Sequence, residues 1–114
     1  MPSKNRDIQQ KLQILQQQYA KKLPDRITAL EQHWQALNLD DPQSTQYENL
    51  IREFHSLAGS GTSYGFPQIT TLSREIENIL RDAKPTLAQN SEQLRTKINA
   101  KLSSLKQAAT EKPD

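Results

Sequence analysis

His55 is the residue of this chain whose surroundings best fit a chemical role. It lies in the stretch FHSLAGSGTSYGF, residues 54–66, where a helical pattern runs into small residues and ends at Gly65. Histidine offers a ring nitrogen that can act as a nucleophile near neutral pH. Gly59, one turn beyond His55, has no side chain to cover the ring, although glycine inside a helix costs about 1 kcal/mol relative to alanine. This spacing predicts a histidine beside an open surface that a partner can approach.

Glu77 is predicted to lie beside His55. On its helical segment His55 falls roughly 90° from the centre of the apolar stripe, and on the next segment Glu77 falls roughly 110° from its stripe in the same sense. His55 precedes Gly65 by ten residues and Glu77 follows it by twelve, so both sit at similar height in an antiparallel hairpin. A carboxylate there can accept one imidazole N–H, which fixes the tautomer and leaves the other ring nitrogen as the nucleophile.

Apolar residues recur at helical spacing through nearly the whole chain. They define five amphipathic segments, over roughly residues 4–22, 24–37, 44–58, 66–84 and 87–109. Pro24 is well placed to begin a helix, so we expect a break before it, and Ser44 is expected to cap the third segment. The predicted core residues of the fourth segment are Ile69, Leu72, Ile76, Ile79 and Ala83.

Amphipathic helices with short connections can bury their apolar faces only against one another. We therefore predict an all-α fold, an antiparallel four-helix bundle with an additional N-terminal helix. A chain of 114 residues is long enough to form one domain with a core of its own. The single domain should cover residues 1–114, with a disordered tail at about 110–114.

The stretch around His55 resembles the signature of histidine-containing phosphotransfer (HPt) domains. That pattern has a histidine, a hydrophobic residue two positions on, then usually lysine, glycine and small residues, and a further glycine ten positions after the histidine. The matching residues here are His55, Leu57, Ala58, Gly59, Ser60 and Gly65. The similarity continues through FPQITTLSREIENILRDA and most resembles the phosphotransfer domain of the chemotaxis histidine kinases. In that branch a glutamate 22 residues after the histidine, here Glu77, hydrogen-bonds to it.

The resemblance implies a phosphocarrier of a two-component phosphorelay and not a classical enzyme. His55 would be the phosphoacceptor, and Glu77 would orient its ring through Nδ1–H so that Nε2 attacks phosphorus. The phosphoryl group would come from a receiver aspartate of a response regulator, or from a histidine kinase, and pass to a receiver aspartate. The receiver would supply Mg²⁺, so the chain itself is expected to need no cofactor.

One position departs from the family pattern: Ala58 stands where a lysine is usual. In the family that lysine places positive charge near the phosphoryl oxygens. Arg52 and Arg74 are possible substitutes, each a turn from His55 or Glu77 on the solvent side, because arginine matches phosphate geometry well. Gly59 would give the receiver clearance to dock. We expect Arg52, Gly59 and Arg74 to contact the phosphoryl group or the receiver.

The composition excludes several other classes of function. With no cysteine, disulfides and thiolate metal sites are excluded, and the two distant histidines make no recognisable metal site. His33, beside Trp34, is interpreted as structural. Apolar runs are short and the N-terminus MPSKNRDIQQ lacks a signal-peptide core, so we expect a cytoplasmic protein without a membrane segment. A net charge of +2 is too small to indicate nucleic-acid binding.

Two other classes of function stay open. The first is an interaction module that keeps the bundle and binds receiver domains without accepting phosphate, which the alanine at position 58 allows. The second is a helical adaptor whose glutamine-rich N-terminal segment forms a coiled coil or a dimer, although Pro24 would limit an uninterrupted seam. We expect a monomer.

Overall fold

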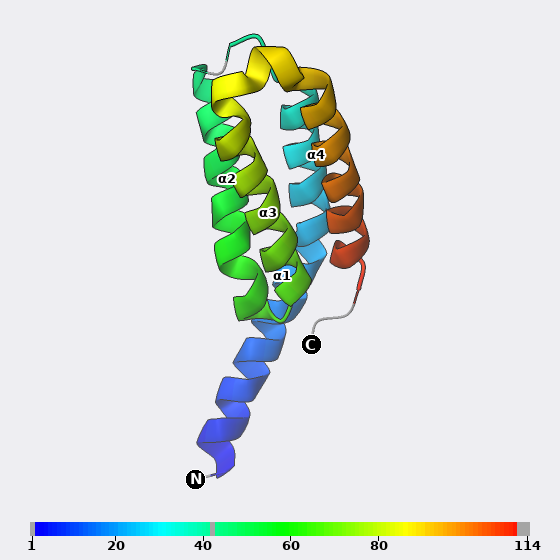
Figure 1. The fold of residues 1–114 in the computed structure, drawn as a ribbon. Helices are drawn as coiled ribbons and strands as arrows, with labels where there is room; N and C mark the ends of the chain where they lie inside the picture. The colour runs from blue at the N-terminus through cyan, green and yellow to red at the C-terminus, as the bar shows by residue number, and fades with distance from the viewer. Residues whose placement is uncertain (1, 42, 112–114) are drawn as a thin grey trace.

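Four helices make up most of the chain. The computed structural model describes residues 2–41 and 43–111, except the side chains of residues 2–5 and 88. The helices are α1 (Pro2–Ala36), α2 (Thr45–Gly61), α3 (Pro67–Ala83) and α4 (Leu87–Ala109). They pack side by side as an antiparallel bundle (Figure 1), and no strand occurs among the described residues. The predicted all-α bundle is therefore confirmed. Within the same residues, no helix is long and apolar enough to cross a membrane.

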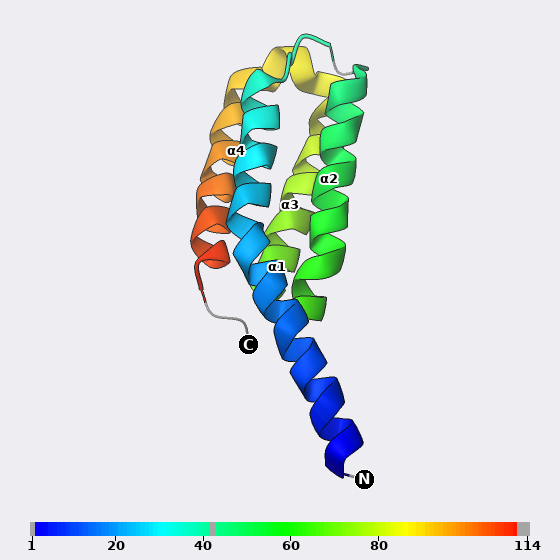
Figure 2. The ribbon, with the colours of Figure 1, turned by 180° about the vertical axis from the view of Figure 1, so that it is seen from behind.

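α1 is one continuous helix, so the predicted break at Pro24 is wrong. Pro24 lies inside α1, where its missing N–H and its ring cost about 3 kcal/mol. Leu23 and Ile27 flank it and are 1 % and 0 % exposed, and the burial of these side chains offsets that cost. The additional N-terminal helix is thus the first part of α1, which extends well beyond the other three helices (Figure 2).

The bundle core combines apolar burial with a few buried hydrogen bonds. Ser44 caps α2 as predicted, and its hydroxyl accepts the N–H of Tyr47 at 3.2 Å. The Tyr47 hydroxyl donates to the carbonyl of Leu80 on α3 at 2.5 Å, and burial raises the pKa of Tyr47 to about 12. The indole N–H of Trp34 donates to Asn99 at 2.9 Å and connects α1 with α4. The buried polar groups of Trp34 and Tyr47 therefore have partners, as a low-dielectric core requires, whereas the buried hydroxyl of Ser73 has none among the described residues.

α3 turns a partly polar face toward α2, which its apolar pattern did not predict. Thr70, Ser73 and Glu77 are buried, and so is Leu80, which lay outside the predicted stripe. Of the predicted core residues, Ile69 and Ile76 are fully buried, whereas Leu72, Ile79 and Ala83 are only partly buried. The small and short polar side chains at positions 70 and 73 let α2 approach α3 closely. The face of α3 that is covered is therefore rotated from the apolar stripe toward Glu77.

Gly61 is the residue that permits this close approach. A Cβ atom at position 61 would lie 2.6 Å from Thr70 Oγ1 and 2.9 Å from the carbonyl oxygen of Phe66. Thr70 Oγ1 donates to the carbonyl of Ala58 at 2.7 Å and accepts the N–H of Thr62 at 2.8 Å. Thr70 therefore joins the last turn of α2 to the first turn of α3. Gly65, with φ of 87°, closes the connection in the left-handed conformation that favours glycine.

The C-terminal end agrees with the pattern as far as it is described. α4 ends at Ala109, and Thr110 and Glu111 follow as a turn and a bend. Of the predicted disordered tail, residues 112–114 lie outside the described residues. The single domain over residues 1–114 stays a prediction.

Substituting Gly61 tests whether the close α2–α3 contact stabilises the fold. We expect Gly61→Ala to lower the free energy of unfolding by about 1–3 kcal/mol, because the added methyl group cannot fit without moving the helices apart. Gly59→Ala is the matched control, since no atom lies within 4 Å of a Cβ there, and it should raise stability by up to about 1 kcal/mol. Urea unfolding followed by circular dichroism measures both. Equal stabilities for the two variants would contradict the role assigned to Gly61.

Candidate functional site

His55 and Glu77 lie side by side across the α2–α3 contact, as their spacing predicted. Nδ1 of His55 is 3.1 Å from Oε1 and 3.0 Å from Oε2 of Glu77. Both carboxylate oxygens therefore share one ring N–H. That hydrogen bond selects the tautomer with the proton on Nδ1 and leaves the lone pair on Nε2.

The two partners differ sharply in exposure. The His55 side chain is 73 % exposed, whereas the Glu77 side chain is 9 % exposed. Among the described residues, no hydrogen bond to Nε2 of His55 is present. The ring nitrogen that can react thus faces solvent, and the carboxylate that holds the ring is buried.

Arg81 is a part of the site that the sequence analysis missed. Its Nε donates to Oε2 of Glu77 at 3.0 Å, and its Nη2 lies 2.9 Å from the same oxygen. The spacing of Glu77 and Arg81, four residues apart on one helix, is the ordinary arrangement for a carboxylate–guanidinium pair and could have indicated it. Arg81 therefore contacts His55 only through Glu77.

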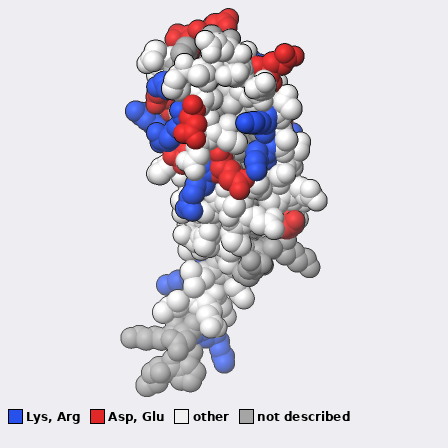
Figure 3. All heavy atoms as spheres, in the orientation of Figure 1, with Lys and Arg blue, Asp and Glu red and all other residues white. Residues whose placement is uncertain are grey.

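A second group of charges adjoins this site across α2 and α3. Lys84 donates to the carboxylate of Glu48. This hydrogen bond, with the nearby positive charges of Arg52 and Arg81, holds the pKa of Glu48 below its ordinary value. In Figure 3, charges of both signs are interspersed over the middle of the α2–α3 face. The end of the bundle where α2 connects to α3 is largely uncharged. The sequence agrees, because residues 56–73 contain no Asp, Glu, Lys or Arg.

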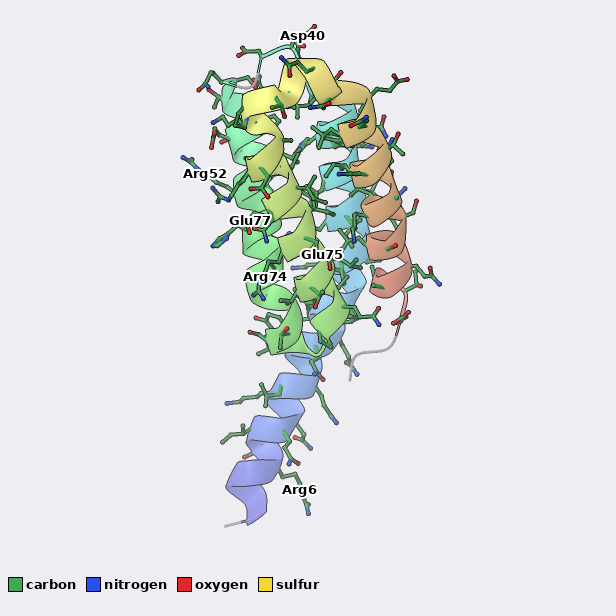
Figure 4. The ribbon with its side chains drawn as sticks, in the orientation of Figure 1. Arg6, Asp40, Arg52, Arg74, Glu75 and Glu77 are labelled. Atoms are coloured by element: carbon green, nitrogen blue, oxygen red, sulfur yellow. The ribbon has the colours of Figure 1, made fainter. Side chains whose placement is uncertain are left out.

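Arg52 and Arg74, the arginines expected to replace the family lysine, are both exposed. They lie on either side of Glu77 along the bundle, Arg52 on α2 and Arg74 on α3 (Figure 4). Among the described contacts, neither donates a hydrogen bond to His55 or Glu77; Arg81 does so instead. Their expected contact with a phosphoryl group or a receiver stays a prediction.

Gly59 leaves the surface next to His55 open. It is exposed, and nothing lies within 4 Å of where its Cβ would be, so helix packing does not explain this glycine. The neighbouring residues Ser56 and Ser60 instead face α1, where Arg26 donates to Ser56 at 3.2 Å and the Tyr19 hydroxyl lies 2.9 Å from Ser60 Oγ. The open face of α2 therefore runs from His55 to Gly59 between α1 and α3.

His33, interpreted as structural, lies on the surface and does not join the site. Its Nδ1 is 3.0 Å from Oε2 of Glu53 on α2, and its side chain is 59 % exposed. No three His, Asp or Glu side chains within the described ranges come together as a metal ion would require. The chemistry of the described face therefore centres on His55, Glu77 and Arg81.

One comparison with known proteins identifies the family. A family model described as "Hpt domain" matches residues 14–108, which include every residue of the site. No curated protein and no solved structure matches this chain.

Removing the Glu77 carboxylate should release the tautomer of His55. We expect the ring of Glu77→Ala to lose its preference for the proton on Nδ1, because no other acceptor holds that N–H. Nitrogen-15 NMR of the histidine ring above pH 8, where imidazole is neutral, measures the tautomer directly. Glu75→Ala is the control, since Glu75 lies on the same helix and pairs with Lys101 instead. An unchanged His55 spectrum in Glu77→Ala would contradict the assignment.

Proposed function

Because this chain belongs to the Hpt domain family, whose members act in histidine phosphotransfer in two-component signalling, we propose that His55 is its phosphoacceptor. The observation that carries the proposal is the contrast between the two ring nitrogens. Nδ1 is held by a buried carboxylate, and Nε2 is open to solvent. A neutral imidazole in this state can attack phosphorus through Nε2 without first losing a proton.

The transfer step is a displacement at phosphorus. The Nε2 lone pair of His55 forms the N–P bond while the P–O bond to a receiver aspartate breaks and its electron pair returns to that carboxylate. The proton on Nδ1 stays in its hydrogen bond to Glu77, and the positive charge that develops on the ring is stabilised by the carboxylate. The reverse step passes the phosphoryl group from His55 to an aspartate of another receiver. The chain acts as a carrier with a phosphohistidine intermediate.

Family members interact with receiver or kinase partners, and we propose response-regulator receivers as the partners of this chain. The receiver would supply Mg²⁺, so this chain needs to contribute only an oriented nucleophile and a surface for docking. The open face from His55 to Gly59 is the proposed docking surface. Arg52 and Arg74, on either side of Glu77 along the bundle, would contact the phosphoryl group or the receiver. A cytoplasmic location follows from such partners.

Phosphoryl transfer from radiolabelled phospho-receivers tests the assignment of His55. We expect acid-labile, base-stable label on the wild-type chain and no label on His55→Gln, because glutamine has no nucleophilic nitrogen. His33→Gln is the matched control: it removes the other of the two histidines and should accept label as the wild type does.

Each result of this assay bears on the choice between carrier and docking module. Label that persists on His55→Gln would overturn the proposed phosphoacceptor. If a receiver binds the wild type but transfers no label, the chain is a docking module that does not accept phosphate.

A second candidate function is favoured by the exposed apolar side chains of α1. Ile8, Leu12, Ile14 and Leu15 are 44–57 % exposed. They belong to the N-terminal half of α1, the helix that extends beyond the bundle at this end (Figure 2). Ile8, Leu12 and Leu15 follow one another at steps of four and three residues, which is the spacing of a helix–helix seam. This segment fits a helical adaptor that associates with a partner helix, including that of a second copy.

Sedimentation of the full chain tests the adaptor function. The adaptor predicts a dimer that Leu12→Glu dissociates, because a charge would interrupt the apolar seam. Gln13→Glu adds the same charge outside the stripe and should leave the dimer intact. Circular dichroism checks that both variants keep the bundle, from which residues 12 and 13 are remote. A wild-type chain that remains monomeric at every concentration would remove self-association and agree with the expected monomer.

A further inference from the structure

We infer that Arg81 is a positioning residue for His55, acting through Glu77; the inference rests on the function proposed above. Arg81 presents two N–H groups to one carboxylate oxygen, Oε2, at 3.0 and 2.9 Å. Nδ1 of His55 lies against both oxygens of the same carboxylate. The three side chains thus form a chain of contacts that begins in the positive charge of Arg81 and ends at the exposed ring.

A buried carboxylate needs such a partner. The Glu77 side chain is 9 % exposed, and burial penalises an ionised group unless hydrogen bonds and an opposite charge compensate. His55 supplies one N–H but, as a neutral ring, no charge. Arg81 supplies a charge that is retained at any ordinary pH, in a planar group whose N–H donors have fixed geometry. It therefore offsets the charge of the buried carboxylate and fixes the rotation of that carboxylate.

The position of Arg81 distinguishes this contact from an ordinary surface ion pair. A pair of residues four apart on an exposed helix usually contributes little. Here one partner is buried between two helices and holds the reactive histidine, so loss of Arg81 would leave an uncompensated charge at the site. Arg81 also lies near Glu48, whose pKa is lowered by Lys84, Arg52 and Arg81 together. Arg81 thus donates its hydrogen bonds to Glu77, whereas Lys84 donates to Glu48.

The charge balance of the site follows from this arrangement. With neutral His55, the charges of Glu77 and Arg81 cancel. A phosphoryl group and the acidic site of a receiver both bring negative charge to His55, and an unpaired Glu77 carboxylate would repel them. Ala58 cannot supply the positive charge that a lysine gives other family members. Arg81 provides a positive charge from α3 that cancels the repulsion without approaching the phosphoryl group.

Arg81→Met tests the inference, because methionine keeps an unbranched stem and removes the N–H donors and the charge. We expect the His55 ring to lose its preference for the proton on Nδ1 in nitrogen-15 NMR. We also expect kcat for transfer from a phospho-receiver to fall about tenfold at unchanged KM, the effect of one charged hydrogen bond lost behind the reacting group. Arg81→Lys keeps the charge without the planar fork and should recover part of both. Lys97→Met removes one exposed positive charge from α4 and is the control for net charge.

The two measurements separate this inference from the proposed function. If Arg81→Met and Lys97→Met have the same His55 spectrum and the same kcat, Arg81 has no positioning role. If the wild type takes no phosphoryl group, the proposed function fails, and the NMR spectra alone decide whether Arg81 positions His55. A fall in kcat with an unchanged His55 spectrum would also overturn the inference, because Arg81 would then act on the partner and not through Glu77.

Discussion

The close contact between α2 and α3 is the constraint on which the rest of the site depends. Glycine at position 61 and the threonine hydroxyl at position 70 bring the two helices together at the hairpin end. That approach buries the flank of α3 that carries Glu77 and sets its carboxylate against the ring of His55 on α2. Because a carboxylate reaches a histidine only over a few ångströms, a wider helix spacing would separate the pair. Packing at one end of the hairpin thus determines the chemistry along its length.

The pairing of His55 with Glu77 could be predicted because helical periodicity fixes direction and the hairpin turn at Gly65 fixes height. Helical periodicity did not predict the features that depend on contacts between helices. Pro24 reads as a helix start, but burial of its neighbours keeps α1 continuous. Leu80 belongs to the core because the short side chains of Thr70 and Ser73 let α2 cover a face of α3 that lies to one side of its apolar stripe. The spacing of Arg81 from Glu77 could have indicated an ion pair, but only the burial of Glu77 in the structure distinguishes this pair from an ordinary surface pair.

α1 is one helix with two environments: one part packs in the bundle and the other is exposed to solvent. Beyond Tyr19 its large apolar residues, such as Leu23 and Ile27, are buried in the bundle, while toward the N-terminus Ile8, Leu12 and Leu15 stay exposed. The family model begins at residue 14, so Ile8 and Leu12 lie outside the matched region. Tyr19 marks the junction: its ring stacks on Tyr64 at 4.6 Å and its hydroxyl meets Ser60. The bundle therefore fixes the direction in which the extension projects.

The unequal exposure of His55 and Glu77 explains how so small a chain could take part in group transfer. The proposed nucleophile would receive its phosphoryl group from another protein and would have to be accessible. The His55 side chain, 73 % exposed, meets that requirement. The hydrogen bond that orients it is stronger away from water, since electrostatic interactions increase as the local dielectric falls. Burying the carboxylate and exposing the imidazole meets both needs with two helices. The remaining requirement is a charge to compensate the buried carboxylate, and Arg81 on the same helix meets it without occupying the proposed docking surface.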